Sequence, residues 1–174
     1  MKQNQNEVIS NLNGMSEKEL EGVHALGSST KYPTEYDPTV LEKFKNPNPE
    51  NDYVVSLDCF EFGSLCPRTH QPDLATIYIS YIPDEYMVES KSLKLYLFSY
   101  RNHGAFHERC VNMIVNDLVE LLHPKYLEVY GDFNSRGGIH ILPFVSYATE
   151  SYKGFEVQRK LDVMQGTLSH HRGR

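Results

Sequence analysis

Residues 75–82 read A-T-I-Y-I-S-Y-I, a run of β-branched and aromatic side chains with an alternating pattern. Such a run, with a period of two, predicts a β-strand that buries one face. Residues 53–62 precede it with a second β-forming run, which contains Val54, Val55 and Leu57. We therefore expect these two segments to form the first two strands of a sheet.

The segment between these strands, residues 63–74, reads G-S-L-C-P-R-T-H-Q-P-D-L. A glycine and two prolines disfavour a regular element, so the segment is predicted to be an irregular loop. Irregular loops held between rigid strands often carry the reacting groups of a site. This loop contains Cys66 and, seven residues later, Asp73.

Residues 89–100 read E-S-K-S-L-K-L-Y-L-F-S-Y and fit two patterns. Leucines at alternate positions indicate a strand. A helix would instead place four large side chains on one face: Leu93, Tyr96, Leu97 and Tyr100. We favour the helix, with Ser90 or Ser92 as its N-cap.

Residues 106–122 are predicted to form a longer helix that ends before Pro124. Its apolar side chains recur at helical intervals: Phe106, Cys110, Met113, Ile114, Leu118, Leu121 and Leu122. Residues 126–133 and 139–145 are predicted to be two further strands. The intervening N-S-R-G-G at residues 134–138 has the composition of a hairpin turn.

The predicted order, β-β-α-α-β-β, gives an α+β fold in which an antiparallel sheet carries two helices on one face. The 174 residues suit one domain, with polar tails at residues 1–15 and 169–174. An open four-stranded sheet leaves two unpaired edges, and pairing between copies would remove them. The edges therefore favour a homo-oligomer.

Composition narrows the class of function. A net charge of −6 and a pI of about 5.7 disfavour direct nucleic-acid binding, which needs a concentrated basic face. We find neither an apolar run of membrane-spanning length nor a signal peptide, so we expect a cytoplasmic protein that acts on a small molecule without membrane association. Three cysteines, Cys59, Cys66 and Cys110, are too few for a disulfide scaffold and are expected to be thiols.

Cys66 and Asp73 are candidates for chemistry. A cysteine becomes a strong nucleophile when its pKa falls below the free value of about 8.5. A carboxyl group in the same pocket can act as its acid or base. A small buried cysteine and a turn-forming aspartate would explain the same residues without any function. The spacing alone leaves both interpretations open.

Two other clusters are similarly ambiguous. Lys91 and Lys94, three residues apart, could hold a phosphate near a helix N-terminus, or could belong to a solvated charged face. His107 and Glu108 could bind the polar edge of a heterocycle, or could be ordinary surface residues.

The sequence also offers three possible metal ligands, but no motif for a dinucleotide. Cys66, His70 and Cys110 could be three zinc ligands, although they form no closely spaced pair. The sequence has no G-x-G-x-x-G or G-x-x-x-x-G-K-[ST] motif, so no usual nucleotide fingerprint is present.

Residues 89–96, E-S-K-S-L-K-L-Y, resemble the signature of the 7-cyano-7-deazaguanine reductases (QueF) at every position. S-L-C-P at residues 64–67 and Q-P-D at 71–73 are similar to the catalytic loop of that family. F-H-E at 106–108 is similar to its substrate-binding segment, and S-R-G-G at 135–138 also matches.

The resemblance covers about residues 19–147 and implies a tunnelling fold, in which the sheets of several subunits join into a barrel. For single-domain, type I members it implies stacked pentameric rings with active sites between subunits. It also implies a catalytic domain at residues 19–150, a flexible tail at 1–18 and an extension at 151–174.

The activity implied by the resemblance is NADPH-dependent reduction of the nitrile of 7-cyano-7-deazaguanine (preQ0) to the aminomethyl group of preQ1, in queuosine biosynthesis for tRNA. Cys66 would add to the nitrile carbon and form a covalent thioimide, while Asp73 would donate the proton to nitrogen. No metal is implied.

The resemblance also assigns binding residues. The substrate pocket would comprise Val88, Glu89, Ser90, His107 and Glu108. The cofactor phosphates would contact Ser90, Lys91 and Lys94. A reversible Cys66–Cys110 disulfide, protecting the nucleophile from over-oxidation, is a further hypothesis.

Two alternatives belong to other classes. One is a zinc-dependent cyclohydrolase or pterin enzyme of the same fold, and the signature at residues 89–96 counts against it. The other is a non-catalytic ring that binds a purine-like ligand, and the pairing of Cys66 with Asp73 counts against that.

Overall fold

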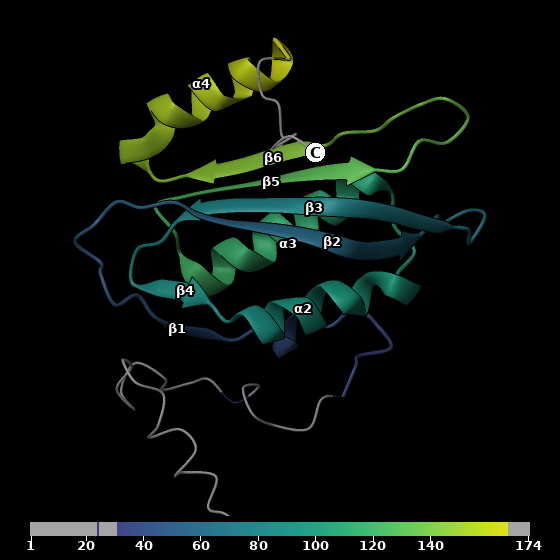
Figure 1. Ribbon diagram of the computed structural model, residues 1–174, viewed down its shortest axis with the longest axis horizontal. Coiled ribbons are helices and arrows are strands. Elements are labelled where there is room, and N and C mark those ends of the chain that lie inside the picture. Colours follow the sequence, from purple (N-terminus) through teal and green to yellow (C-terminus); the bar gives the residue numbers. More distant parts are fainter. Residues whose placement is uncertain (1–23, 25–30, 167–174) are drawn as a thin grey trace, which may run out of the picture.

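A computed structural model describes residue 24 and residues 31–166 (Figure 1). The predicted tail at residues 1–18 and the chain end at 167–174 lie outside the described residues. The main body is an antiparallel sheet with strand order β2-β3-β5-β6. Its strands are β2 (Val55–Leu65), β3 (Pro72–Ile82), β5 (Tyr126–Phe133) and β6 (Phe144–Ala148).

The predicted core order β-β-α-α-β-β is confirmed, because two helices follow β3 and precede β5. They are α2 (Ser90–Phe98), continued by the 3₁₀ turn η2 (Ser99–Asn102), and α3 (His107–Leu122). The ambiguous segment at residues 89–100 is helical, and burial explains the outcome. All four side chains of the expected helical face are buried: Leu93, Tyr96, Leu97 and Tyr100.

The N-cap of α2 differs from the prediction. Glu89, and neither Ser90 nor Ser92, caps the helix, because its carboxylate accepts the backbone N–H groups of Lys91 and Ser92. A carboxylate there also complements the positive end of the helix dipole. Ser92 instead turns its hydroxyl to the Glu89 carbonyl.

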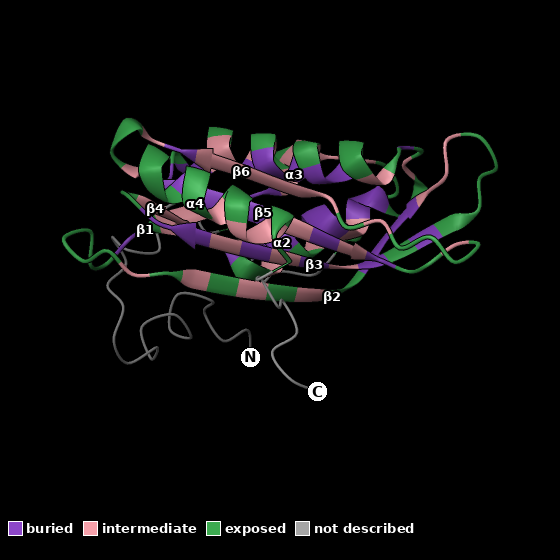
Figure 2. Cartoon of the chain, turned by 90° about the horizontal axis from the view of Figure 1, so that it is seen from above, coloured by how far each residue is buried: buried purple, intermediate pink, exposed green. Residues whose placement is uncertain are grey.

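The core lies between the sheet and these helices. Ile77 and Ile79 of β3, with Leu127 and Val129 of β5, are at most 1% exposed. They belong to one cluster with the buried stripe of α3. Figure 2 shows that stripe as buried turns facing the sheet, with exposed turns outward. Each such side chain contributes roughly 1.5–3 kcal/mol by leaving water, which anchors α3 across the sheet.

A half-buried carboxylate joins the helices to the segment that precedes the sheet. Asp117 of α3 accepts hydrogen bonds from the hydroxyls of Tyr96 on α2 and Tyr36 in the lead-in. The Tyr36 oxygen lies 2.6 Å from the carboxylate. These bonds satisfy polar groups that would be costly to bury alone.

Several strand boundaries differ from the prediction. β2 continues to Leu65 and β3 starts at Pro72, so the irregular loop is shorter than expected. Ser64 pairs with Asp73 in that extension, and Pro72 is tolerated because it is the first residue of its strand. The last strand begins at Phe144 and not at residue 139. A tight turn between Arg136 and Ile139 forms as expected, but no ladder follows it directly.

Four short elements were not predicted, in addition to the helix α4. β1 (Lys43–Lys45) and β4 (Tyr86–Val88) form a separate two-stranded sheet. The 3₁₀ turns η1 (Pro38–Val40) and η3 (Glu150–Tyr152) precede β1 and the last helix.

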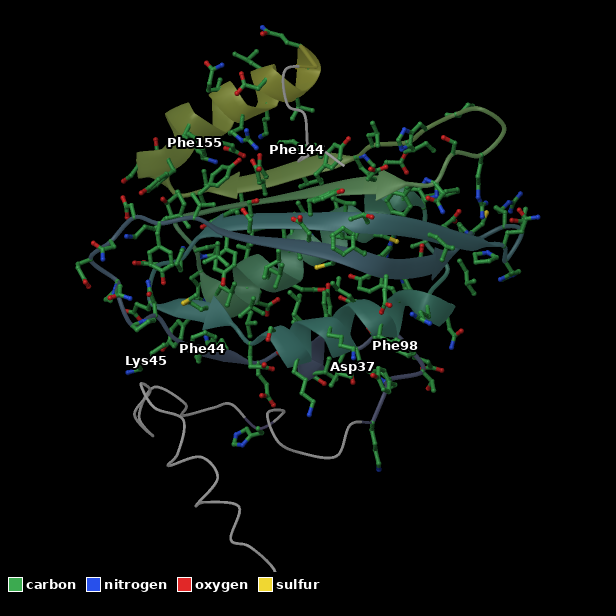
Figure 3. The ribbon with its side chains drawn as sticks, in the orientation of Figure 1. Asp37, Phe44, Lys45, Phe98, Phe144 and Phe155 are labelled. Carbon is green, nitrogen blue, oxygen red and sulfur yellow. The ribbon has the colours of Figure 1, made fainter. Side chains whose placement is uncertain are left out.

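A third helix, α4 (Lys153–Met164), occupies the expected C-terminal extension. It packs on the face of the sheet opposite α3. Phe155 contacts Tyr126, and Arg159 pairs with Glu128. Tyr126 and Glu128 flank Leu127 on β5, so their side chains point to the face opposite that of Leu127. Figure 3 shows Phe155 on α4 and Phe144 on β6 on the same side of the molecule. In the described part of the chain, every helix is too short or too polar to cross a bilayer.

Candidate active site

Cys66 is the first residue after β2, in a loop closed by its own backbone. The Cys66 N–H donates to the Gln71 carbonyl, and the Cys66 carbonyl accepts from His70 N–H, both at 2.9 Å. His70 takes a left-handed conformation, with φ of 55°, to complete the turn. The loop therefore holds the thiol at the end of two paired strands.

The environment of Cys66 favours its thiolate. The pKa of this half-buried thiol is lowered by a hydrogen bond from the Thr69 hydroxyl, and further by the backbone N–H groups of Arg68 and Thr69. Burial and the Asp73 carboxylate oppose this effect without reversing it. The result is a cysteine that ionises more easily than usual, as a nucleophile requires.

Asp73 sits directly across the hairpin from Ser64, with its side chain 4% exposed. One carboxylate oxygen, Oδ1, lies 3.1 Å from His107 Nε2 and 2.7 Å from Arg136 Nη2. Neither contact aligns as a hydrogen bond to Oδ1. The Arg136 contact is an ion pair, and the His107 contact is one only when the imidazole carries a proton. Cys66, Asp73 and His107, all predicted site residues, are thus brought together, and Arg136 joins them from the β5–β6 loop.

His107 and Glu108 open α3 but face different surroundings. The His107 ring stacks on Phe133 with centroids 4.1 Å apart, which fixes its Nε2 towards Asp73. Glu108 is exposed beside it in the first turn of the helix. It is free to contact a ligand placed over this end of the sheet.

Cys110 lies one turn further along α3 and is completely buried. Burial raises the pKa of its thiol to about 11, although a hydrogen bond with Ser64 acts in the opposite direction. Cys66 and Cys110 are both free thiols in this structure. The predicted protective disulfide stays a prediction.

The remaining predicted residues lie at the other end of α2. Val88 and Glu89 are buried in the chain itself: Val88 N–H donates to the Tyr81 hydroxyl, and Glu89 caps the helix. Ser90 and Lys94 are exposed, and Lys91 is half-buried. Cys66 is adjacent to the opposite end, because Leu65 N–H bonds to the His103 carbonyl that follows η2. The nine residues of α2 alone span about 13 Å, so one chain does not bring the two groups together.

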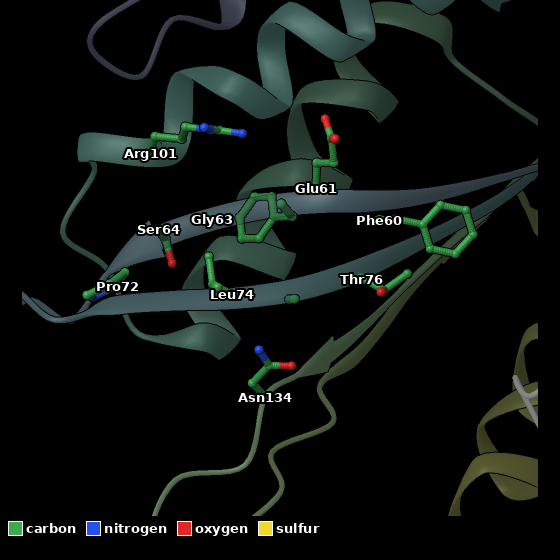
Figure 4. A pocket seen from close by; sticks show the side chains of 11 residues that line it. Phe60, Glu61, Gly63, Ser64, Pro72, Leu74, Thr76, Arg101 and Asn134 are labelled. Carbon is green, nitrogen blue, oxygen red and sulfur yellow. The ribbon is translucent and has the colours of Figure 1, made fainter.

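Two cavities border β2, one of them between β2 and α2 and the other over β2 and β3. One, of about 410 Å³, is lined by Ser90 and Lys94 but not by Lys91, and Arg101 adds a second cation. The other, of about 480 Å³, reaches Ser64 and Pro72, the neighbours of the catalytic loop (Figure 4). Arg101 lines both cavities, so a continuous surface links the lysine end to the thiol end.

The three candidate ligands of the zinc alternative are not grouped. Within residues 31–166 and at residue 24, no three His, Cys, Asp or Glu side chains are grouped to hold a metal ion. His70 is exposed while Cys110 is completely buried, so the two cannot share an ion with Cys66 in this conformation.

Fold and site together define a class: an α+β tunnelling-fold protein with an activated thiol beside a buried carboxylate. Residues 72–152 match the family model described as QueF-like protein. Proteins named NADPH-dependent 7-cyano-7-deazaguanine reductase are 62% identical to the chain, in Helicobacter pylori strain P12 and in Bacillus velezensis. The first alignment covers 80% of this chain and 94% of the relative, the second 79% and 84%. The chain belongs to the 7-cyano-7-deazaguanine reductase (QueF) family.

A solved structure supports the same fold. The apo form of the archaeosine synthase QueF-Like superposes with a TM-score of 0.53 over 57% of this chain and 97% of that one. At 19% sequence identity, this likeness concerns the fold alone.

Proposed function

We propose that this chain is an NADPH-dependent reductase that converts the nitrile of 7-cyano-7-deazaguanine into an aminomethyl group, within queuosine biosynthesis. The observation that carries the proposal is the lowered pKa of Cys66 beside the buried Asp73, in a chain 62% identical to reductases of that name. A nitrile carbon accepts hydride poorly, and addition of a thiolate makes it more reactive.

The first step forms a thioimide on Cys66. The sulfur bonds to the nitrile carbon, one π bond of the nitrile breaks, and the nitrogen takes a proton. Asp73 accepts the thiol proton and delivers it to that nitrogen, so the proton count balances. His107 and Arg136 keep the carboxylate in place for this transfer.

Substrate recognition falls to groups at the same end of the sheet. Glu108 would accept the N–H groups of the deazaguanine ring, with His107 beside it. Val88, Glu89 and Ser90 would complete this pocket from a neighbouring chain.

The cofactor would lie between β2 and α2, where Ser90, Lys94 and Arg101 line one cavity. Lys94 and Arg101 would contact the phosphates of the dinucleotide, with Lys91 nearby. Asp58 and Glu61 line the same cavity, so the phosphates would lie at its Lys94 and Arg101 side, away from these carboxylates. When bound, NADPH supplies the hydride for each of two reduction steps. The enclosing side chains exclude water, which would hydrolyse the imine between the steps.

The active enzyme would be a homo-oligomer of stacked pentameric rings, with each site shared by two subunits. The separation of Cys66 from Ser90 within one chain supports a shared site. So do the free edges of β2 and β6, which would pair between subunits and close the sheets into a barrel. A nucleophilic thiol also requires a reducing compartment, which favours the cytoplasm.

The test follows NADPH absorbance after addition of 7-cyano-7-deazaguanine to the freshly reduced protein. We expect two NADPH consumed per nitrile by the wild type and none by Cys66→Ala. Cys59→Ala is the comparison, because Cys59 is a half-buried thiol on β2 whose pKa burial raises to about 11. Cys59 lines the cavity proposed for the cofactor, so this variant can change the KM for NADPH, but it should still consume two NADPH per nitrile.

Two results would overturn the proposal. The first is a reduced wild-type protein that consumes no cofactor. The second is one tightly held zinc per chain together with loss of activity on chelation, which would favour the cyclohydrolase alternative.

A further inference from the structure

Arg136 bridges two acceptors at the base of the catalytic hairpin. Its Nη2 donates to the Pro72 carbonyl at 2.7 Å and lies 2.7 Å from Asp73 Oδ1. The two acceptors belong to consecutive residues at the start of β3. One guanidinium nitrogen therefore ties the carboxylate to the backbone that carries it.

The segment that presents Arg136 is a tight turn on an exposed loop. Arg136 and Ile139 exchange both backbone hydrogen bonds at 3.0 Å, and Gly137 and Gly138 take positive φ values of 57° and 79°. Such values favour glycine, so the turn needs both glycines. The Arg136 side chain is 39% exposed, in contrast with the 4% of Asp73. The turn thus delivers a partly solvated cation to a buried anion.

The orientation of the Asp73 carboxylate depends on few partners. His107 approaches from α3 and Arg136 from the β5–β6 loop, while the thiols of Cys66 and Cys110 are the other titratable groups that sense its charge. His107 is held by its stacking on Phe133 and gives Oδ1 one fixed contact. Arg136 gives Oδ1 its second and shorter contact, so without Arg136 a single contact at 3.1 Å would hold the carboxylate.

We propose that Arg136 is a positioning residue for the reduction: its guanidinium clamps Asp73 to the Pro72 carbonyl and holds the carboxylate where it can take the Cys66 proton. The inference rests on the proposed function, because it concerns the thioimide step. In that step the thiol proton passes to Asp73 and then to the nitrile nitrogen, while sulfur bonds to carbon. A carboxylate that turns away interrupts the transfer without altering either partner.

The experiment measures thioimide formation directly and omits NADPH, so cofactor binding does not enter. Reduced protein is mixed with 7-cyano-7-deazaguanine. Mass spectrometry of the intact protein then records how fast its mass rises by that of one substrate molecule. We expect Arg136→Ala to be slower by about tenfold or more, as for loss of a charge-assisted contact. Arg136→Lys should recover part of the rate, because it keeps the charge but lacks the planar fork.

Chemical rescue separates positioning from a structural role of the loop. Added guanidinium ion, at concentrations that leave the fold intact by circular dichroism, should accelerate Arg136→Ala several-fold and leave the wild type unchanged. His140→Ala is the matched control, since His140 lies in the same loop but pairs with Asp132. Its rate should equal that of the wild type.

The possible failures are distinguishable. A wild type that forms no adduct overturns the proposed function. If the wild type forms the adduct and Arg136→Ala forms it at the same rate, only the positioning role is overturned. A slow Arg136→Ala that guanidinium does not accelerate also overturns that role, because the loop would then matter for its structure alone.

Discussion

At the scale of single residues, the three thiols differ sharply in their surroundings. Cys66 has hydrogen-bond donors that lower the pKa of its thiol, whereas burial raises the pKa values of Cys59 and Cys110 to about 11. At pH 8 a thiol of pKa 11 is a thiolate on the order of one part in a thousand, whereas the lowered pKa of Cys66 leaves a much larger fraction of its thiol ionised.

We therefore predict that iodoacetamide at pH 8 labels Cys66 about a hundredfold faster than Cys59 or Cys110. Labelling of Cys66 should also level off at a lower pH than for an ordinary cysteine, because its thiolate forms earlier. Peptide mapping over a time course provides the rates, and urea-denatured protein, in which all three should react alike, is the control. Comparable rates in the folded protein would contradict this account of Cys66.

Most of the candidate catalytic cluster could be predicted from the sequence, and one member could not. Cys66, Asp73 and His107 stand in recognisable segments, and the fold brings them together. Arg136 and Asp73 are far apart in the sequence, so no local sequence pattern predicts their contact. The only signal was S-R-G-G at residues 135–138, which a hairpin turn explains equally well.

At the scale of elements, α4 shows how ion pairs can dock a helix without an apolar stripe. Arg159 pairs with Glu128 on β5, and Glu156 contacts Lys153, Lys160 and Ser146. Burial raises the pKa of Glu156, but hydrogen bonds from Lys160, Lys153 and Ser146 outweigh it and lower the pKa to about 2. The contacts that bury this helix face are thus largely polar, which explains why hydrophobic periodicity did not predict α4.

We predict that Glu156→Gln lowers the free energy of unfolding by about 1–2 kcal/mol at pH 7, where the carboxylate is ionised and paired. The folded pKa of about 2 lies below the ordinary 4.5, so the contribution is fully present above pH 4.5 and is lost as the pH falls towards 2. Urea unfolding between pH 3 and 7 measures it. Glu120→Gln, on the exposed side of α3, is the control for charge alone. A difference that does not shrink below pH 4.5 would exclude the ion pairs as its source.

The remaining elements divide by length and by burial. The long strands and α3 carry a regular apolar period, and the sequence predicted them. β1 and β4 have three residues each, too few for a period, and they exist because Lys43 and Val88 are brought opposite each other by the packing of α2. Strand boundaries near residues 63–74 were also missed, since pairing of Ser64 with Asp73 depends on the partner strand.

At the scale of the whole molecule, the chain presents two half-sites and two free edges. The thiol end and the Ser90–Lys94 end are separated by α2, yet cavities along β2 connect them. β2 is itself an edge strand, and it exposes Phe60 at 68%. A neighbouring copy that paired with this edge would cover the apolar surface and bring its own lysine end towards Cys66.

Mixing two inactive variants tests this arrangement. Cys66→Ala lacks the nucleophile and Lys94→Ala lacks a cofactor cation, so each alone should turn over little or no nitrile. In randomly mixed oligomers, a site shared by two subunits is intact when the first carries Cys66 and the second carries Lys94. That occurs in about one quarter of the sites for equal amounts, so about a quarter of the wild-type activity should return. Mixed oligomers verified by native mass spectrometry that stay inactive would show that each chain builds its site alone.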